Sequence, residues 1–467
     1  MKEDFDPSFD ERNNDDRLIK LEDMFADAAY YYFDVNEWEG IIEHYLSSLK
    51  LDKAVKALTF AQNQHPMNLE LMLKEAEVLA ENKKPAQAIA LLKKLETSYP
   101  FDPELNMMQG SVYSRFGQHV KALAAYKQAL SKMDDARSDV LLQMSSECQI
   151  LDMPAQSLFW LKTLLKEEPE NIEGLYELSL CFESLDRIQE GISFFQQFVE
   201  QNPYNHHIWF NLGNLYTAND QLEEALVSYD YSVLSYDEFS SGWYNKGTLL
   251  SKLDRYTEAI ECYSRTLELE GPSAPTYCNM AECYENLEDS QNALDYYQKT
   301  LDHDESYLEA WIGAANIYLD LNNLENALNY SEKACKLDSS NPQANYIFAE
   351  VCQGLGFVEE SRKAYKKVIQ ADSDNWEVYL DYSALLFEHD EKEEALFVIE
   401  SGITLTGNKV ELAYRAGTYC YLMGMKSKAF DHWNTAGMEN PQAFIQVFDY
   451  CSELQNLLEV QEFFENF

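Results

Sequence analysis

Three asparagines recur at equal intervals near the middle of the chain: Asn211, Asn245 and Asn279. Each amide carries one acceptor oxygen and two N–H donors on a short side chain, so it can pair with both the C=O and the N–H of a peptide backbone. A regularly spaced row of such amides matches a regular extended polypeptide and binds it with little dependence on its sequence. The chemistry that these residues offer is recognition of a protein segment.

Motifs of the common catalytic and cofactor sites are missing from the sequence. It contains no P-loop, no dinucleotide-binding G-x-G-x-x-G, no H-E-x-x-H and no G-x-S-x-G. Its eight histidines are scattered. The only neighbours, His206 and His207, are expected to point to different faces of a helix and to make a poor metal pair. We therefore expect no enzyme activity, no cofactor and no metal.

A repeat of 34 residues positions the asparagines. Laid over itself with this shift, the stretch 206–271 matches in four places: Trp209 with Trp243, Gly213 with Gly247, Ala225 with Ala259, and Tyr229 with Tyr263. The spacing W-x2-L-G-x2-Y, followed by Ala and an aromatic residue, resembles the tetratricopeptide repeat (TPR), a helix-turn-helix unit. The resemblance covers nearly the whole chain. It implies an all-α fold, a right-handed superhelical solenoid of antiparallel helix pairs.

Twelve full repeats are predicted over residues 35–441. Position 8 of the repeat is a small residue in eleven of the twelve, and position 20 is small in all of them, as two closely crossing helices require. Large apolar residues at positions 4, 11 and 24 fill the space around the crossing. In this frame the repeats begin at Val35, Leu69, Pro103, Ser138, Ile172, His206, Ser240, Ala274, Leu308, Pro342, Trp376 and Val410.

The two ends and two internal joints depart from the pattern. Residues 1–16 are predicted to be an acidic, disordered leader, and 17–34 a capping segment with one amphipathic helix from Arg17 to Phe33. Residues 442–467 are predicted to be a truncated repeat with capping helices. One extra residue at 131–139 suggests a hinge, and the polar Ser331 and Asn345 suggest a weaker interface. The expected packing residues of the last segment are Val447, Tyr450, Cys451 and Leu454, followed by a second helix over 459–464.

Charge and cysteine content limit the partner and the compartment. With 36 basic and 81 acidic residues, the net charge of −45 repels nucleic acid and anionic lipid and favours a neutral-to-basic polypeptide partner. No run of 18 apolar residues occurs, so no membrane insertion is expected. The nine cysteines form no C-x-x-C pair, which indicates reduced core thiols of a cytoplasmic protein. Three of them share repeat position 11: Cys148, Cys352 and Cys420.

The TPR resemblance implies where a partner binds. In TPR proteins the first helices of successive repeats line a concave face, into which positions 2, 5, 6, 9, 12 and 13 point. In this chain aromatics at position 5 would hold side chains, and acids would favour Lys or Arg. The predicted peptide-binding residues are Tyr176, Phe210, Asn211, Asn214, Tyr244, Asn245, Asn279, Glu282, Glu285 and Asn316. Further acids at these positions are Glu173, Glu177, Glu183, Glu309, Asp320 and Glu350, and Tyr346 is a further aromatic.

Several functions are consistent with this pattern. The favoured one is a non-catalytic scaffold or adaptor that holds an extended neutral-to-basic segment in the groove near repeats five to nine. The alternatives are an assembly subunit whose partner docks on the convex face or the edges, and a regulatory subunit of a separate enzyme. A co-chaperone with a carboxylate clamp is disfavoured, because Phe210, Pro275 and Asn279 stand where basic clamp residues are expected. The sequence leaves the oligomeric state open.

Overall fold

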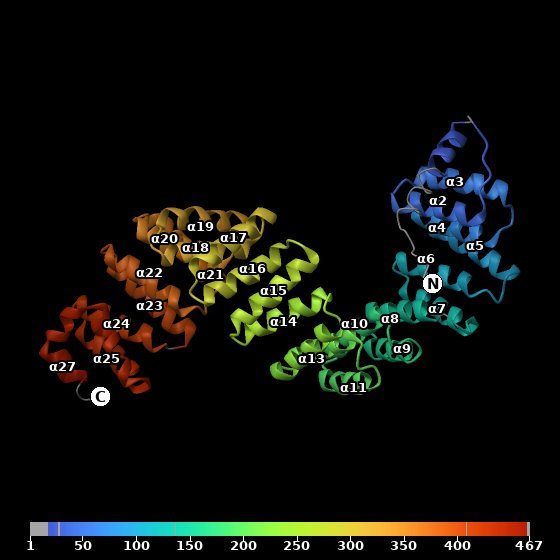
Figure 1. Ribbon diagram of the computed structural model, residues 1–467. Helices are drawn as coiled ribbons and strands as arrows, with labels where there is room; N and C mark the ends of the chain where they lie inside the picture. The colour runs from blue at the N-terminus through green and yellow to red at the C-terminus, as the bar shows by residue number, and fades with distance from the viewer. Residues whose placement is uncertain (1–16, 27–28, 136, 408, 465–467) are drawn as a thin grey trace. The chain divides into compact units, whose positions relative to one another are not determined.

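The computed structural model describes residues 17–26, 29–135, 137–407 and 409–464. Within these ranges helices follow one another as pairs and no strand occurs, which confirms the all-α expectation (Figure 1). None of the described helices combines the length and the apolarity needed to cross a membrane. The chain forms two compact units, Met1–Tyr236 and Asp237–Phe467, which we call unit 1 and unit 2.

Within its described residues, unit 1 contains six helical hairpins. Each first helix begins at the residue where a repeat begins in the 34-residue frame. The first helices are α2 (Val35–Ser47), α4 (Leu69–Glu81), α6 (Pro103–Arg115), α8 (Ser138–Ile150), α10 (Ile172–Ser184) and α12 (His206–Ala218). The second helices are α3 (Leu51–Gln64), α5 (Pro85–Ser98), α7 (His119–Lys132), α9 (Pro154–Glu167), α11 (Ile188–Gln201) and α13 (Leu222–Ser235).

The part of unit 2 that the structure describes contains six more hairpins and a carboxyl-terminal segment. The first helices are α14 (Ser240–Lys252), α16 (Ala274–Asn286), α18 (Leu308–Asp320), α20 (Pro342–Leu355), α22 (Trp376–Glu388) and α24 (Val410–Leu422). The second helices are α15 (Tyr256–Glu270), α17 (Ser290–His303), α19 (Leu324–Leu337), α21 (Val358–Ala371), α23 (Lys392–Thr406) and α25 (Lys426–Glu439). Short 3-10 and α-helices complete the unit: η1 (Pro441–Phe444), α26 (Ile445–Tyr450), η2 (Ser452–Asn456) and α27 (Leu458–Phe464).

Every hairpin turns in the same way. The residue at repeat position 15 has a positive φ in all twelve, from Leu49 (57°) to Gly424 (80°). The N–H at position 16 then donates to the C=O at position 11, as Lys50 does to Tyr45 at 2.8 Å. This left-handed turn satisfies the last carbonyls of the first helix and reverses the chain. Asp, Asn or Gly occupies the position in nine repeats, the residue types that tolerate the left-handed region best.

The two helices of a hairpin cross at positions 8 and 20, as the small residues there predict. In repeat 4 the hydroxyls of Ser145 and Ser157 are 2.7 Å apart. In repeat 10 Ser361 donates to the backbone oxygen of Ala349 at 2.8 Å. The large residue at position 24 then packs over the small one, so that a Cβ added to Gly213 would lie 2.7 Å from the Tyr229 ring. Close approach of the backbones therefore explains the small residues.

The amino-terminal helix is shorter than predicted. It covers residues 17–25, and the chain is extended over 29–34, so the expected helix as far as Phe33 is wrong. Gln64 captures the backbone of this segment, because its amide donates to the Tyr31 oxygen at 2.7 Å and accepts from the Phe33 N–H at 3.1 Å. Leu21 and Met24 of the helix are buried against α2. The predicted leader 1–16 lies outside the described residues.

The carboxyl-terminal segment also differs from the prediction. A single first helix was expected through Cys451, but the backbone of Cys451 adopts φ −152°, which separates α26 from η2. Because the chain bends there, Leu454 and Val460 still reach the apolar end of the last hairpin and are buried. Phe464 of α27 packs 5.3 Å from the Trp433 ring. The segment thus covers the exposed side of α24 and α25.

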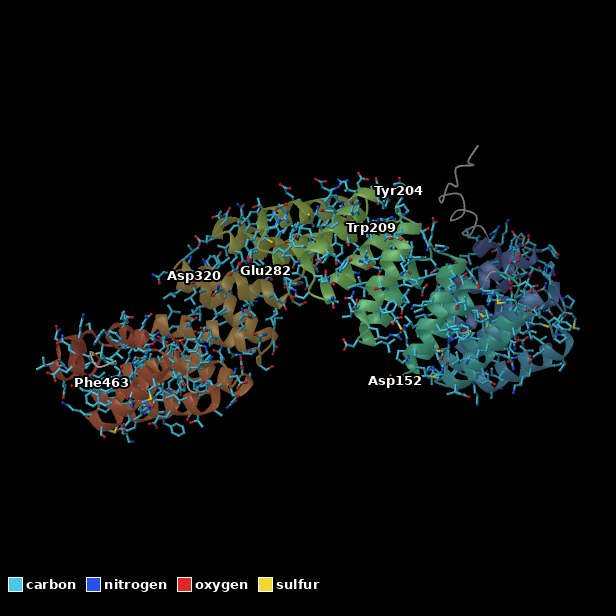
Figure 2. The ribbon with its side chains drawn as sticks, turned by 90° about the horizontal axis from the view of Figure 1, so that it is seen from below. Asp152, Tyr204, Trp209, Glu282, Asp320 and Phe463 are labelled. Carbon is cyan, nitrogen blue, oxygen red and sulfur yellow. The ribbon has the colours of Figure 1, made fainter. Side chains whose placement is uncertain are left out.

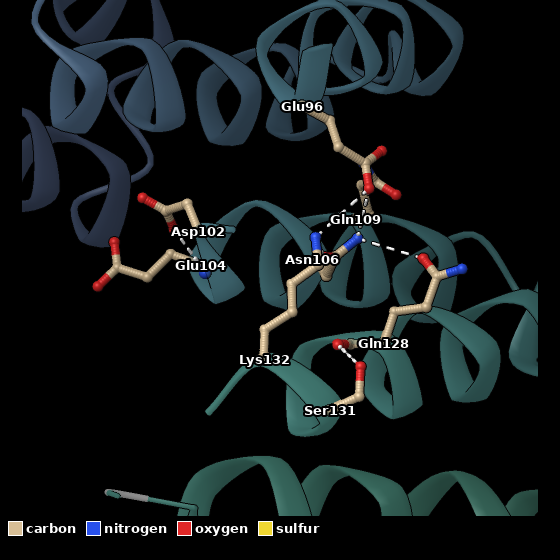
Figure 3. A network of polar contacts seen from close by, with 8 residues as sticks. All are labelled: Glu96, Asp102, Glu104, Asn106, Gln109, Gln128, Ser131 and Lys132. Atoms are coloured by element: carbon tan, nitrogen blue, oxygen red, sulfur yellow. Dashed lines mark hydrogen bonds and ion pairs between the residues drawn. The ribbon is translucent and has the colours of Figure 1, made fainter. Parts of the chain in front are cut away.

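A polar network replaces apolar packing at position 4 of repeat 3 (Figure 3). Asn106 is fully buried and donates to Glu96 and Gln128, both at 3.3 Å, while Lys132 donates to its oxygen at 2.6 Å. Gln109 donates to the other oxygen of Glu96 at 3.3 Å. Burial alone would raise the pKa of the Glu96 carboxyl group. The hydrogen bonds from Asn106 and Gln109, together with Lys132, have the larger effect and lower this pKa. The network joins α5, α6 and α7.

The polar residues near 331–345 are also buried and hydrogen-bonded. Ser331 donates to the Ala327 oxygen at 2.7 Å, and Asn345 donates to the oxygens of Asn341 and Ser339 at 2.7 and 3.2 Å. These bonds stay within the residue's own helix or reach the turn directly before it, so they join no two helices. The surrounding core consists largely of Ala, Ile and Val side chains.

All nine cysteines are free thiols. Cys148, Cys352 and Cys420, which share position 11, are fully buried. Burial raises the pKa of Cys352 to about 12 and that of Cys420 to about 11. These groups therefore behave as small apolar core residues.

Candidate binding surfaces

The predicted residues of unit 1 are only partly open to solvent. Tyr176 on α10 is 49% exposed, but Asn211 on α12 is 2% exposed. The Asn211 amide donates to the His207 oxygen at 2.8 Å, one turn earlier in its own helix. Asn214 is half-buried and accepts a hydrogen bond from the Tyr229 hydroxyl at 2.8 Å. The expectation that Asn211 lies open for a ligand is therefore wrong, because helix packing buries its side chain.

Phe210 and the neighbouring histidines pack tightly. Phe210 is half-buried, and its ring lies 6.0 Å from that of Tyr229. The rings of His206 and His207 are 4.0 Å apart, so the expectation that they point to different faces is wrong. His206 is the first residue of α12, where its side chain can fold over the next residue. Burial, with the charge of His206, lowers the pKa of His207 to about 4.

In unit 2 the remaining asparagines lie half-buried among aromatic and acidic groups. The Asn279 amide donates to the Tyr244 hydroxyl at 3.0 Å, linking α16 to α14. Asn245 lies on the same stretch of α14 as Tyr244 and is half-buried. Asn316 on α18 donates to Glu285 at 3.3 Å. The structure thus places these amides on neighbouring first helices and engages Asn279 and Asn316 in bonds within the protein.

Carboxylates crowd the first helices of repeats 8 and 9. Glu285 accepts from the Tyr297 hydroxyl at 2.7 Å. Glu282, marked with Asp320 in Figure 2, keeps contact with water, yet the surrounding protein atoms desolvate it. This desolvation, with the charges of Glu285 and Glu309, raises the pKa of Glu282. A cation placed here would relieve the repulsion.

A second acidic group lies on α20 and α22. Desolvation, followed by the charges of Asp381, Asp320 and Glu377, raises the pKa of Glu350 to about 7. Asp381 accepts from the Tyr346 hydroxyl at 2.6 Å, and desolvation raises its pKa although Tyr346 and Arg415 act in the opposite direction. The aromatic residue expected at position 5 therefore orients a carboxylate in this repeat.

A concave acidic site lies in unit 1, on repeats 1–4, where no binding residue was predicted. A hollow of roughly 490 Å³ opens on the first helices α2, α4, α6 and α8. The apolar side chains that line it include Leu73, Met107 and Met108. Desolvation and the charges of its neighbours raise the pKa of Glu39. The carboxylates that line the hollow are Glu39, Glu70, Glu104 and Asp139, beside Lys74 and Gln143. We call this site the acidic hollow.

The repeat frame contained the signal for the acidic hollow. Glu70, Glu104 and Asp139 all occupy position 2 of their repeats, and Glu39 occupies position 5. The search for a regular asparagine row drew attention to repeats 5–9 and passed over these positions. Cavity depth, which depends on the short Ser111 and the flexible methionines, could not be seen in the sequence.

Within the described residues, no group of three or more His, Cys, Asp and Glu side chains could hold a metal ion. The pKa shifts found on the first helices follow from burial and from like charges. They give these carboxylates a preference for cationic groups.

Comparison with known proteins identifies the family. Models described as tetratricopeptide repeat match residues 194–227, 238–306 and 308–341, and a tetratricopeptide repeat-like domain matches residues 43–147. No curated protein sequence matches the chain.

Solved structures with a similar chain trace include two TPR proteins and one hetero-tetramer. YrrB, described as a TPR protein with an unusual peptide-binding site, is 19% identical, with 42% of this chain and 97% of that chain covered and a TM-score of 0.35. The matched chain of the Cut9–Hcn1 APC/C hetero-tetramer is 11% identical. The match covers 90% of this chain and 98% of that chain, with a TM-score of 0.42. A TPR protein from Parabacteroides merdae is 18% identical. The match covers 52% of this chain and 98% of that chain, with a TM-score of 0.42. From the family models and the repeated helical hairpins, we conclude that the chain is a tetratricopeptide repeat protein.

Proposed function

We propose that this TPR protein holds a basic, extended segment of a partner protein against the first-helix surface of its repeats, and that the acidic hollow is the principal contact. TPR proteins are protein-interaction scaffolds, so the partner class is protein. The proposal adds the chemistry of the partner and the place where it binds.

One observation carries the proposal: four carboxylates and several apolar side chains together line a hollow large enough for side chains. A Lys or Arg side chain has the matching form, because its charged end can meet carboxylates while its methylene stem covers apolar surface. The raised pKa of Glu39 supports this reading, since a bound cation would offset the repulsion from Glu70 and Glu104.

The unit 2 carboxylates support the same class of ligand. Glu282, Glu285 and Glu309 lie near half-buried amides that can bind a peptide backbone. Asn245 and Asn279 lie on the same group of first helices, so the hypothesis that asparagine amides bind the partner's backbone still applies to unit 2. In unit 2 the charge attraction would contribute most to binding, and hydrogen bonds to the partner's backbone would contribute less.

Binding of a fluorescent Lys/Arg-rich peptide, measured by anisotropy at several salt concentrations, tests the proposal. Affinity should fall steeply as salt rises. The variant E39Q/E70Q/E104Q/D139N should weaken binding about tenfold or more. Its control, D52N/D134N/D152N/D186N, makes the same charge change at four exposed acids outside the hollow and should bind almost as the wild type does.

Two outcomes contradict the proposal. Equal losses in both variants would mean that overall charge, and not the hollow, attracts the peptide. Tighter binding of an acidic peptide ending in a free carboxylate would instead support a clamp-type co-chaperone, which Lys74 alone among the residues lining the hollow could serve.

A further inference from the structure

We propose that a groove on the second-helix surface of repeats 5 and 6, between α11 and α13, binds a Lys or Arg side chain of a partner protein on the paired rings of Trp209 and Tyr231. This site is separate from the first-helix surface and does not depend on the function proposed above. We call it the outer groove. Trp209 is labelled in Figure 2.

Ser228, a small residue at position 23 of repeat 6, lines the outer groove. In repeats 8 and 9 the same position holds Tyr296 and Tyr330, whose rings pack 5.3 Å from Tyr284 and 5.2 Å from Tyr318. Ser228 is too small to do this, and its hydroxyl bonds to the Glu224 backbone oxygen at 2.8 Å. A cavity of roughly 660 Å³ remains, with Ser228 among its lining residues.

The walls of the outer groove are held in place. The ring of Trp209 stacks on that of Tyr231 at 4.6 Å with an interplanar angle of 22°, and its indole N–H donates to the Pro203 oxygen at 2.8 Å. On the opposite side the Tyr216 hydroxyl accepts from the Gln196 amide at 2.7 Å. Because these rings are fixed by their own contacts, a ligand would meet a preformed surface.

The charge of the outer groove selects a cation. Glu200, Glu223 and Glu224 line it and are exposed, and none of the described residues that line it is basic. An ammonium or guanidinium group over the face of an indole or phenol ring is attracted by the ring and by nearby carboxylates. Val227, 52% exposed, would cover an apolar neighbour on the partner.

Elsewhere in the chain, lysines of the protein itself make this interaction with rings at position 23. In repeat 8 the ammonium of Lys299 lies 3.9 Å from the centre of the Tyr296 ring. Between repeats 4 and 5 the ammonium of Lys162 on α9 lies 5.3 Å from the centre of the Phe194 ring, and Phe194 also occupies position 23. The outer groove has the rings, the carboxylates and the space for a cation, but its described lining residues include no Lys or Arg. The cation that fits therefore comes from another molecule.

The test uses a short benzophenone-bearing peptide of Arg, Leu and Ala, and a matched peptide in which Gln replaces Arg. Both are measured on the full chain carrying E39Q/E70Q/E104Q/D139N, so that the acidic hollow contributes little. The Arg peptide should bind at least about tenfold more tightly than the Gln peptide. Photo-cross-links of the Arg peptide should map to residues 196–231.

Ser228→Tyr should fill the groove, as tyrosine does in repeats 8 and 9, and reduce binding of the Arg peptide about tenfold. Ser193→Tyr places the same side chain at an exposed position of α11 outside the groove and should leave binding unchanged. If Ser228→Tyr unfolds the chain, Glu223→Gln with Glu224→Gln provides the second variant, which should weaken the Arg peptide and not the Gln peptide.

The proposal is overturned if folded Ser228→Tyr, or the double glutamine variant, binds the Arg peptide as the parent does, or if the cross-links lie only outside residues 196–231. Unchanged peptide binding in the acidic-hollow variant, with cross-links in the outer groove, would contradict the proposed function and leave this inference intact.

Discussion

At the scale of single residues, the repeat depends on pairs of a small and a large side chain. Gly417 at position 8 faces the ring of Trp433 at position 24, and Trp433 is fully buried. A Cβ added to Gly417 would lie 2.4 Å from the indole Cδ1 and 3.0 Å from the Ala429 backbone oxygen. The ring could shift only by displacing a packed core.

We therefore expect Gly417→Ala to lower the free energy of unfolding by about 1–3 kcal/mol, because the added methyl group overpacks the crossing. Urea denaturation followed by circular dichroism measures the change. Gly40→Ala is the matched control, since nothing lies within 4 Å of its added Cβ and helix propensity favours alanine by about 0.5–1 kcal/mol. A Gly417→Ala protein as stable as the control variant would contradict this account of position 8.

Glu350 makes stability depend on pH. Its folded-state pKa is about 7 against an ordinary value of 4.5, so between these values the folded state holds more protons than the unfolded chain. Stability contributed by the protonated group is therefore lost as pH rises from about 4.5 to about 7. Above that range the ionised carboxylate faces Asp381, Asp320 and Glu377 and costs stability.

Glu350→Gln should raise the free energy of unfolding at pH 8 by on the order of 1–2 kcal/mol and leave it nearly unchanged near pH 4.5. The measurement is the difference between variant and wild-type urea unfolding over this pH range. Glu388→Gln, an exposed acid on the neighbouring helix α22, serves as control. A constant difference at every pH would rule out the titration as its source.

The Asn106 network shows how a buried amide can replace an aromatic residue. Removing the amide leaves Lys132 and Glu96 with fewer partners in a half-buried place, and such groups are costly when unpaired. Asn106→Ala should lower the free energy of unfolding by about 1–3 kcal/mol. Gln128→Ala, which removes one exposed partner from the same network, should change it by less than about 0.5 kcal/mol. Thermal denaturation compares the two, and equal effects would contradict the importance of the buried amide.

At the scale of helices, the 34-residue period alone located the first helix of every hairpin, because small residues at positions 8 and 20 leave one register for the crossing. The left-handed turn at position 15 was readable too, since Asp, Asn and Gly recur there, but Leu49, Lys83 and Glu288 obscure the pattern. The ends were less predictable. Gln64, from the second helix of repeat 1, decides that residues 29–34 are extended, and this contact between distant parts of the sequence has no local signal.

The candidate sites were predictable in chemistry and less so in position. Acids and amides on first helices followed from the frame, yet the burial of Asn211 and the depth of the acidic hollow depend on neighbouring side chains. The outer groove depends on what Ser228 leaves unfilled. A periodic sequence shows which position a residue occupies, whereas a cavity arises from the volumes of several residues together.

Two joints between hairpins are expected to open most readily. Residues 131–139 carry the extra residue of the repeat, and the joint near 331–345 is built from small side chains with polar groups bonded within their own helices. Native-state hydrogen exchange should be faster there than in helices α12 and α24, because local opening exposes less apolar surface. Uniform protection across these joints and their neighbours would contradict both parts of this prediction.

At the scale of the whole molecule, charge and fold oppose each other. A net charge of −45 makes the folded chain repel itself, and packing must overcome this repulsion in addition to chain entropy. At Glu39, Glu282 and Glu350, desolvation together with neighbouring acidic charges raises the pKa, so like charges crowd at these groups. Binding of a basic partner and binding of simple cations should therefore stabilise the protein through the same groups.

Raising monovalent salt from about 0.01 M to about 0.1 M shortens the screening length from about 30 Å to about 10 Å, and the thermal midpoint should rise by a few degrees, about as much as a gain of 1 kcal/mol produces. Sodium chloride and tetramethylammonium chloride should act alike, because screening depends on charge and not on ion size. If only sodium raised the midpoint, site binding would be the cause. In the E39Q/E70Q/E104Q/D139N variant the rise should be smaller than in the exposed-acid control, because crowded carboxylates repel more strongly than scattered ones.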